Sequence, residues 1–242
     1  MDVFDRDAVE AVGEEWVRAE KINEALKTLR ELCLPVVERV GDYARSKIAW
    51  KLANYRMAMI YRGVSLGASA TQLWNTRHVL TSVLAARALV ETAALLRDFT
   101  DTCERALEAS DLEQLNRVAD DATFATRLKH WNEDSRFPPS KNVLTVLDRL
   151  DKKFGGIRGH YDRLSEFCHP NYLGHFAAFG KLDHDTGRVA YSFDKIFNKG
   201  LLSHVFGGLL LTWLIEIDAD RLANLIPKVA ELQHQQNPVR RE

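Results

Sequence analysis

The strongest constraint on the fold is an apolar run, residues 79–96, whose only charged side chains are Arg87 and Glu91. A second apolar run, residues 201–217, contains one histidine and one glutamate as its only ionisable residues. Each run falls short of the roughly 20 uninterrupted apolar residues that cross a lipid bilayer. We therefore expect two buried core helices rather than membrane spans, and no membrane among the partners of the chain.

The N-terminal part of the chain shows apolar side chains three and four positions apart, the spacing of amphipathic helices. Residues 7–61 predict two helices that are divided at Pro35. The segment 63–71, "GVSLGASAT", predicts a loop because it combines glycines with small polar residues. Ser69 or Thr71 then caps a third helix that runs to about residue 100.

The C-terminal part predicts a long apolar helix from about residue 196 to residue 233, kinked at Pro227. Before it, a loop at residues 183–187 separates two runs rich in aromatic residues, which predicts a small β-hairpin. The expected fold class is therefore mainly α, a helical bundle with a β-hairpin insert at about residues 176–193. We expect one helical domain over residues 1–242, with N-terminal helices at 1–63, a core at 71–233 and a mobile tail at 234–242.

Charge and cysteine content narrow the function classes. The chain has 33 Lys and Arg against 34 Asp and Glu, a formal net charge of −1, so any attraction to nucleic acid has to come from a local patch. Its three cysteines lie far apart, which argues against a disulfide framework. The acidic N-terminus does not resemble a secretory signal. These features predict a protein of the reducing cytoplasm.

The segment "YDRLSEFCHPNYLGH", residues 161–175, contains the densest group of chemically active side chains. Its helix is expected to end at His169, because a residue before proline is disfavoured in the helical conformation. On an ideal helix Ser165 shares a face with His169, whereas Arg163 lies roughly 120° away. Two interpretations stay open: a catalytic edge, or a helix end capped by His169 with a turn at Asn171.

Arg87 and Glu91 are four residues apart and so lie on one helical face. Burial of either charge alone would be costly, so we expect them to pair with each other or with polar groups from residues 161–171. Such a pair either anchors the helix to a neighbour or lines a polar cleft in which Glu91 holds Arg87 against an anion.

Residues 140–163 carry six Lys or Arg and three Asp, a local cationic excess. This pattern fits a phosphate-facing patch and also an ordinary solvated helix surface. The histidines and aspartates of residues 160–185 lack a specific ligand spacing, so no metal site is predicted. The chain has no GxxxxGK[ST], GxGxxG or GxSxG motif, and no cofactor is expected.

Two of these segments, "AARALVETAALL" and "YDRLSEFCHPNYLG", together resemble the HEPN superfamily of all-α domains. The resemblance is closest to poorly characterised bacterial branches with an Arg-x-Leu-x-Glu helix and a later Tyr-x-x-Leu-Ser…His-Pro segment. It covers roughly residues 71–174. The superfamily signature, Arg and then His after four to six residues, corresponds here to Arg163 and His169.

The resemblance implies a metal-independent RNA endonuclease of toxin or phage-defence type, with a cleft shared by the two subunits of a homodimer. Arg163 and His169 would be the catalytic pair. Arg163 would stabilise the phosphoryl charge, and His169 would transfer the proton. The supporting or substrate-binding residues would be Arg87, Glu91, Tyr161, Ser165 and Asn171. An antitoxin or defence-system protein is a further expected partner.

One departure from the ribonuclease pattern keeps a second hypothesis open. The residue after the arginine is usually polar in ribonuclease members, and here it is Leu164. The alternative is a non-catalytic HEPN-like module that binds a nucleotide, RNA or a protein partner.

Overall fold

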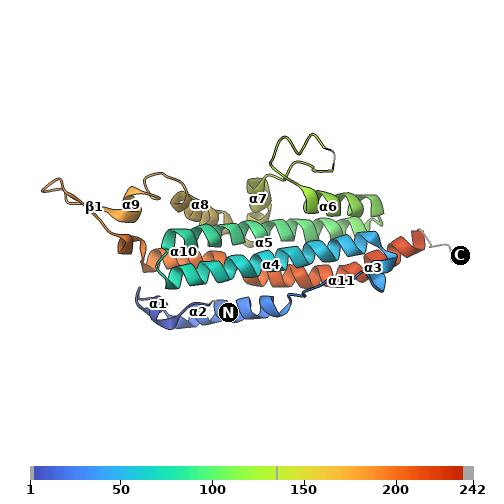
Figure 1. Cartoon of the computed structure of the whole chain (residues 1–242), viewed down its shortest axis with the longest axis horizontal. Coiled ribbons are helices and arrows are strands. Elements are labelled where there is room, and N and C mark those ends of the chain that lie inside the picture. Colours follow the sequence, from blue (N-terminus) through green and yellow to red (C-terminus); the bar gives the residue numbers. More distant parts are fainter. Residues whose placement is uncertain (1–2, 135, 237–242) are drawn as a thin grey trace.

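The protein is a helical bundle with one two-stranded antiparallel sheet, as seen in a computed structural model that describes residues 3–134 and 136–236 (Figure 1). The helices are α1 (Arg6–Glu10), α2 (Trp16–Glu31), α3 (Asp42–Arg45), α4 (Lys47–Asn75), α5 (Val79–Glu108), α6 (Leu112–Phe124), α7 (Val143–Phe154), α8 (Ile157–Cys168), α9 (Phe176–Phe179), α10 (Lys199–Leu209) and α11 (Thr212–Gln236), with a 3-10 turn, η1 (Phe193–Ile196). The strands are β1 (Gly180–Leu182) and β2 (Val189–Tyr191). The predicted fold class is confirmed.

Three long helices, α4, α5 and α11, run side by side and form the core (Figure 1). α5 also packs against α7, α8 and α10, so it is covered on several sides. Leu89, Val90, Ala93 and Leu96 of α5 are at most 1% exposed. The apolar run at residues 79–96 is therefore explained by burial within the bundle.

Two stretches, α5 and residues Lys199–Gln236, are long and apolar enough to cross a membrane by length and composition. About 61% of the most apolar window of α5, and 50% of that in the second stretch, is buried inside the protein. Helices at the core of a bundle meet the same criteria of length and composition, so these two stretches are weak evidence for a membrane span.

The loop predicted at residues 63–71 is wrong, because these residues form the middle of α4. A side chain at Gly67 would collide with Leu26 of α2, and a Cβ at Gly63 would lie 3.0 Å from Ile215 Cδ1 of α11. The glycines allow close helix packing at this position instead of breaking the helix. The next long helix, α5, begins at Val79. The expected boundary between the N-terminal helices and the core, at residues 63–71, lies within α4.

The second N-terminal helix was predicted to contain Val36, Val37 and Val40, and this is also wrong. The break at Pro35 is present, but the chain has no helix between Glu31 and Asp42. Val36 and Val40 are exposed at 64% and 60%. Valine is a weak helix former, and here few tertiary contacts compensate for that weakness.

The C-terminal helix is divided into α10 and α11 at residues 210–211, and Pro227 lies within α11. The β-hairpin lies within the predicted range, with Gly180 opposite Tyr191, and it projects from one end of the bundle (Figure 1). Of the predicted mobile tail, residues 234–236 belong to α11. Residues 237–242 of that tail lie outside the described residues.

Candidate functional site

The helices α7 and α8 lie on α5 and present the candidate site at one edge of the bundle (Figure 1). Asn142 caps α7 by accepting a hydrogen bond from the Leu144 amide, 3.0 Å long. Gly155 and Gly156 connect the two helices with φ values of +65° and +81°, which favour glycine.

Helix α8 ends as predicted, and His169 is its C-cap with an extended backbone at φ −91° and ψ 147°. Asn171 Oδ1 accepts from the amides of Leu173 and Gly174, both 3.1 Å long, so the chain turns back on the helix end. A Cβ on Gly174 would collide with the carbonyl oxygen of His169. The turn therefore requires glycine and leaves the His169 side chain exposed.

Arg87, Glu91 and Tyr161 form a hydrogen-bonded triad between α5 and α8. Arg87 Nη2 donates to Tyr161 Oη at 2.7 Å, Tyr161 Oη donates to Glu91 Oε1 at 2.8 Å, and Arg87 Nη2 lies 3.2 Å from Glu91 Oε1. The predicted pairing of Arg87 and Glu91 with residues 161–171 is confirmed. Both charged side chains remain about a quarter exposed, at 27% and 25%, so their burial is only partial.

The triad favours a charged Arg87 and a neutral Tyr161. Burial acts to lower the pKa of Arg87, but its hydrogen bond with Tyr161 and the nearby Glu91 outweigh this effect and raise it. Burial raises the pKa of Tyr161, and its hydrogen bond to Glu91 adds to the rise, whereas Arg87 opposes it. Arg87 therefore presents a permanent positive charge.

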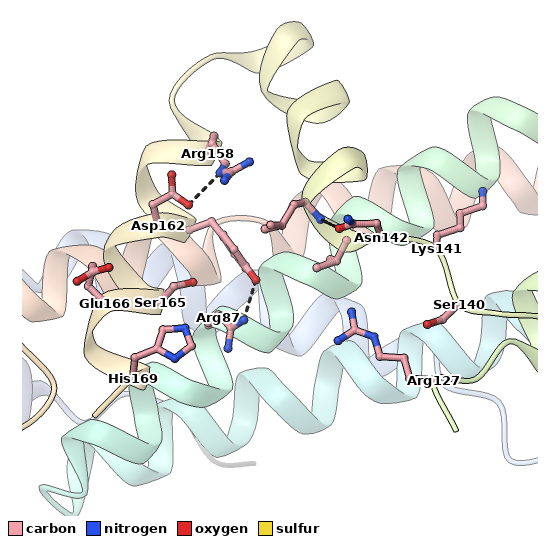
Figure 2. A pocket seen from close by; sticks show the side chains of 13 residues that line it. Arg87, Arg127, Ser140, Lys141, Asn142, Arg158, Asp162, Ser165, Glu166 and His169 are labelled. Carbon is pink, nitrogen blue, oxygen red and sulfur yellow. Dashed lines mark hydrogen bonds and ion pairs between the residues drawn. The ribbon is translucent and has the colours of Figure 1, made fainter. Parts of the chain in front are cut away.

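A cavity of about 870 Å³ opens beside the triad, between α8, the start of α7 and the loop before α7 (Figure 2). Four Lys or Arg and two acidic residues line it, together with His169. The four cations are Arg87, Arg127, Lys141 and Arg158. The cavity therefore has the local cationic excess that the whole chain lacks.

The cations differ in how far neighbouring acids already neutralise them. Lys141 Nζ lies 2.6 Å from Asp98 Oδ2 and points away from His169 (Figure 2), and Arg158 pairs with Asp148 and Asp162. Among the described residues, no acidic side chain pairs with Arg127. Figure 2 shows Arg127 reaching toward Arg87 from the opposite wall.

Two polar atoms of cavity-lining residues are buried without a hydrogen-bond partner. These atoms are Ser165 Oγ and Arg87 Nε, on facing helices. Buried polar atoms in proteins are nearly always hydrogen-bonded, because an unmade bond costs roughly 1–3 kcal/mol. The two atoms therefore keep unused hydrogen-bonding capacity beside the cavity.

Some of the other predicted site residues line the cavity, and others lie outside it. Ser165 and His169 line the cavity with Arg87 and Tyr161, and Asn171 supports the turn by donating to Glu166 Oε2 at 2.8 Å. Arg163 does not line the cavity, and its guanidinium lies 5.7 Å from the Phe167 ring centre. This agrees with the expected position off the His169 face.

Leu164 is fully buried, so its apolar character serves the packing of α8 against the bundle. Arg163 lies instead toward α10, near His204. Burial lowers the pKa of His204 most, followed by the charges of His160 and Arg163. Within one chain, Arg163 therefore lies outside the cavity that His169 lines.

Arg127 is the residue that sequence reasoning missed. It lies in a region with no apolar period and no motif, and only the fold brings it opposite Arg87. Lys141 and Arg158 belonged to the predicted basic patch. Within the described ranges 3–134 and 136–236, no group of three His, Cys, Asp or Glu side chains is placed to hold a metal ion.

Comparisons of the chain with family models, with curated proteins and with solved structures find no match.

Proposed function

We propose that the protein is a HEPN-like module that binds the phosphate group of RNA or of a nucleotide in the cavity beside His169. The observation that carries the proposal is the position of Arg87 and Arg127 on opposite walls of one cavity, with His169 at its edge. Guanidinium groups bind phosphate oxygens with charge-assisted, often bidentate hydrogen bonds.

The start of α7 adds to the attraction. Residues Ser140 to Leu144 line the cavity, and the first turn of α7 carries no acidic side chain that would offset its positive end. The unpartnered Arg87 Nε and Ser165 Oγ supply two more hydrogen-bonding groups. A phosphate therefore finds both charge and donors in one place.

Fluorescence anisotropy with a short labelled single-stranded RNA tests this proposal. Arg127→Ala should weaken binding and reduce the slope of log affinity against log salt by about 0.7, the value for one lost phosphate contact on a single strand. The exposed Arg39, between α2 and α3, provides a matched control, and Arg39→Ala should leave the slope unchanged. Equal effects of both substitutions would contradict the proposal.

Cleavage of RNA is the second candidate function, and the position of His169 at the cavity edge beside Arg87 favours it. In this alternative His169 transfers the proton, and Arg163 is contributed across a homodimer to stabilise the phosphoryl charge. RNA should then be cut in EDTA to 2′,3′-cyclic phosphate ends. His169→Ala should lower the rate by a factor on the order of 10² to 10⁴.

The assay separates the two candidates when binding is measured in parallel. Cleavage by wild type that His169→Ala and Arg163→Ala both abolish supports the ribonuclease. Binding with no cleavage, or with equal trace cleavage in all variants, supports the non-catalytic module. Loss of cleavage on addition of EDTA contradicts the metal-independent mechanism.

The proposal also covers the location, the oligomeric state and the partners of the protein. A HEPN-like module of this kind would act in the cytoplasm, as a homodimer, and an antitoxin or defence-system protein would be its regulatory partner. Light scattering at high micromolar concentration tests the dimer, and a monomeric mass would count against a cleft shared by two subunits.

A further inference from the structure

A second cavity, of about 480 Å³, adjoins the first. The two cavities share four lining residues, which are Arg127, Ser140, Lys141 and Val143. Arg127 thus lies where the cavities meet, and a ligand whose anionic group contacts Arg127 can extend from one cavity into the other. This inference rests on the proposed phosphate site.

The second cavity has a different chemical lining from the first. Its walls are mainly apolar, and they include Tyr55, Phe99, Pro138 and Pro139. Leu95, Ala122 and Ala125 contribute further apolar surface. A charged or strongly hydrated group would lose water there without replacement, whereas a planar ring would bury apolar surface.

Two carboxylates, Glu91 and Asp121, are the acidic groups of this second cavity. Tyr161 and Arg87 both contact Oε1 of Glu91, so Oε2 keeps its capacity to accept hydrogen bonds. A carboxylate accepts from amino groups and repels carbonyl oxygens. Acceptance of a hydrogen bond from the cytosine amino group is a known mode of base recognition by Glu and Asp.

We propose that the second cavity binds the base of a nucleotide whose phosphate occupies the first cavity, and that it prefers a base with an exocyclic amino group. The ligand is a ribonucleotide, either free or within an RNA strand. Glu91 acts in both cavities, because one oxygen fixes Tyr161 and Arg87 and the other faces the base.

Isothermal titration with ribose 5-phosphate, UMP and CMP tests the inference. Ribose 5-phosphate has the phosphate and sugar but no base. UMP and CMP have bases of the same size, but cytosine has a 4-amino group and an N3 acceptor where uracil has a 4-carbonyl and an N3–H donor. We expect CMP to bind about tenfold more tightly than ribose 5-phosphate, from ring contacts, and several-fold more tightly than UMP. Glu91→Gln should remove the preference of CMP over UMP.

Ala122→Trp is designed to fill the second cavity from the partly buried Ala122. It should lower CMP affinity to that of ribose 5-phosphate and leave ribose 5-phosphate binding unchanged. Ala125→Trp approaches the cavity from the end of α6 and serves as a second filling variant if Ala122→Trp fails to fold. Unchanged CMP affinity in a folded filling variant would overturn the inference.

The outcomes distinguish this inference from the proposed function. Equal binding of CMP and ribose 5-phosphate to wild type, with both weakened by Arg127→Ala, would overturn the base cavity and keep the phosphate site. No binding of any of the three compounds or of RNA would overturn both. With the base cavity supported, tighter binding of the trinucleotide CpCpC than of CMP indicates an RNA strand, and the reverse indicates a free nucleotide.

Discussion

Two groups of charged residues lie along α5, and they differ in how completely their hydrogen bonds are satisfied. The buried charge cluster, named for the fully buried Asp218 at its centre, also contains the partly exposed Arg97, Asp101, Glu104 and Arg221. In it, Asp218 is fully buried and lies 2.7 Å from both Arg97 Nε and Arg221 Nη1. Arg221 also contacts Asp101 and Glu104. Each of these charges therefore has an opposite partner.

The Arg87 triad lies earlier on the same helix and is less complete. Arg87 uses Nη2 for both Tyr161 and Glu91, and its Nε has no partner. In contrast, the Nε of Arg97 is bonded to Asp218. The comparison indicates that the buried charge cluster stabilises the fold, whereas the triad leaves donors for a ligand.

Removal of Asp218 should have the largest effect on stability. Asp218→Ala leaves Arg97 and Arg221 without their shared carboxylate, and it should lower the free energy of unfolding by about 3–5 kcal/mol. Urea denaturation measures this change. Asp218→Asn keeps an acceptor oxygen and should cost less. A change below about 1 kcal/mol for Asp218→Ala would contradict the structural role of the cluster.

Gly174→Ala should have the next largest effect, about 1–3 kcal/mol, because its Cβ would collide with the rigid carbonyl of His169. Gly159 in α8 is the matched control, since a Cβ there meets nothing within 4 Å. Gly159→Ala should be stabilising by about 0.5–1 kcal/mol. Equal stabilities of the two variants in urea would show that the turn after His169 does not need glycine.

Acid should weaken the buried charge cluster through Asp101. Burial acts to raise the pKa of Asp101, but hydrogen bonds from Lys153 and Arg221 outweigh it, and the pKa is lowered. The resulting stabilisation is fully present above the unfolded pKa of about 3.9 and is lost as the pH falls below it. When the free energy of unfolding is measured against pH, Asp101→Asn should lose less stability in acid than wild type does. The same acid loss in both would contradict this linkage.

The sequence predicted the local features of the site because short-range chemistry determines them. Pro170 acts on the adjacent backbone, so the end of α8 at His169 was correctly expected. The contact of Arg87 with residues 161–171 also followed, because a charge on so apolar a helix needs a polar partner.

The features that sequence reasoning missed depend on tertiary packing. Gly63 and Gly67 read as loop residues, yet they allow α4 to pack closely against α2 and α11. Arg127 has no local signal, and only the path of the chain after α6 brings it to the cavity. The pairing of Asp98 with Lys141 and Arg149 spans 43 and 51 residues, and no spacing rule relates them.

The central claim is that the Arg87 triad serves a ligand and the buried charge cluster serves the fold. The same substitution in both places tests it most directly, because lysine keeps the positive charge and lacks the arginine Nε and its planar fork. RNA binding and urea stability are measured for Arg87→Lys and Arg97→Lys. We predict that Arg87→Lys weakens RNA binding about tenfold and changes stability by less than about 0.5 kcal/mol, whereas Arg97→Lys lowers stability by more than about 1 kcal/mol and leaves binding intact. Loss of stability with unchanged binding in Arg87→Lys would contradict the account.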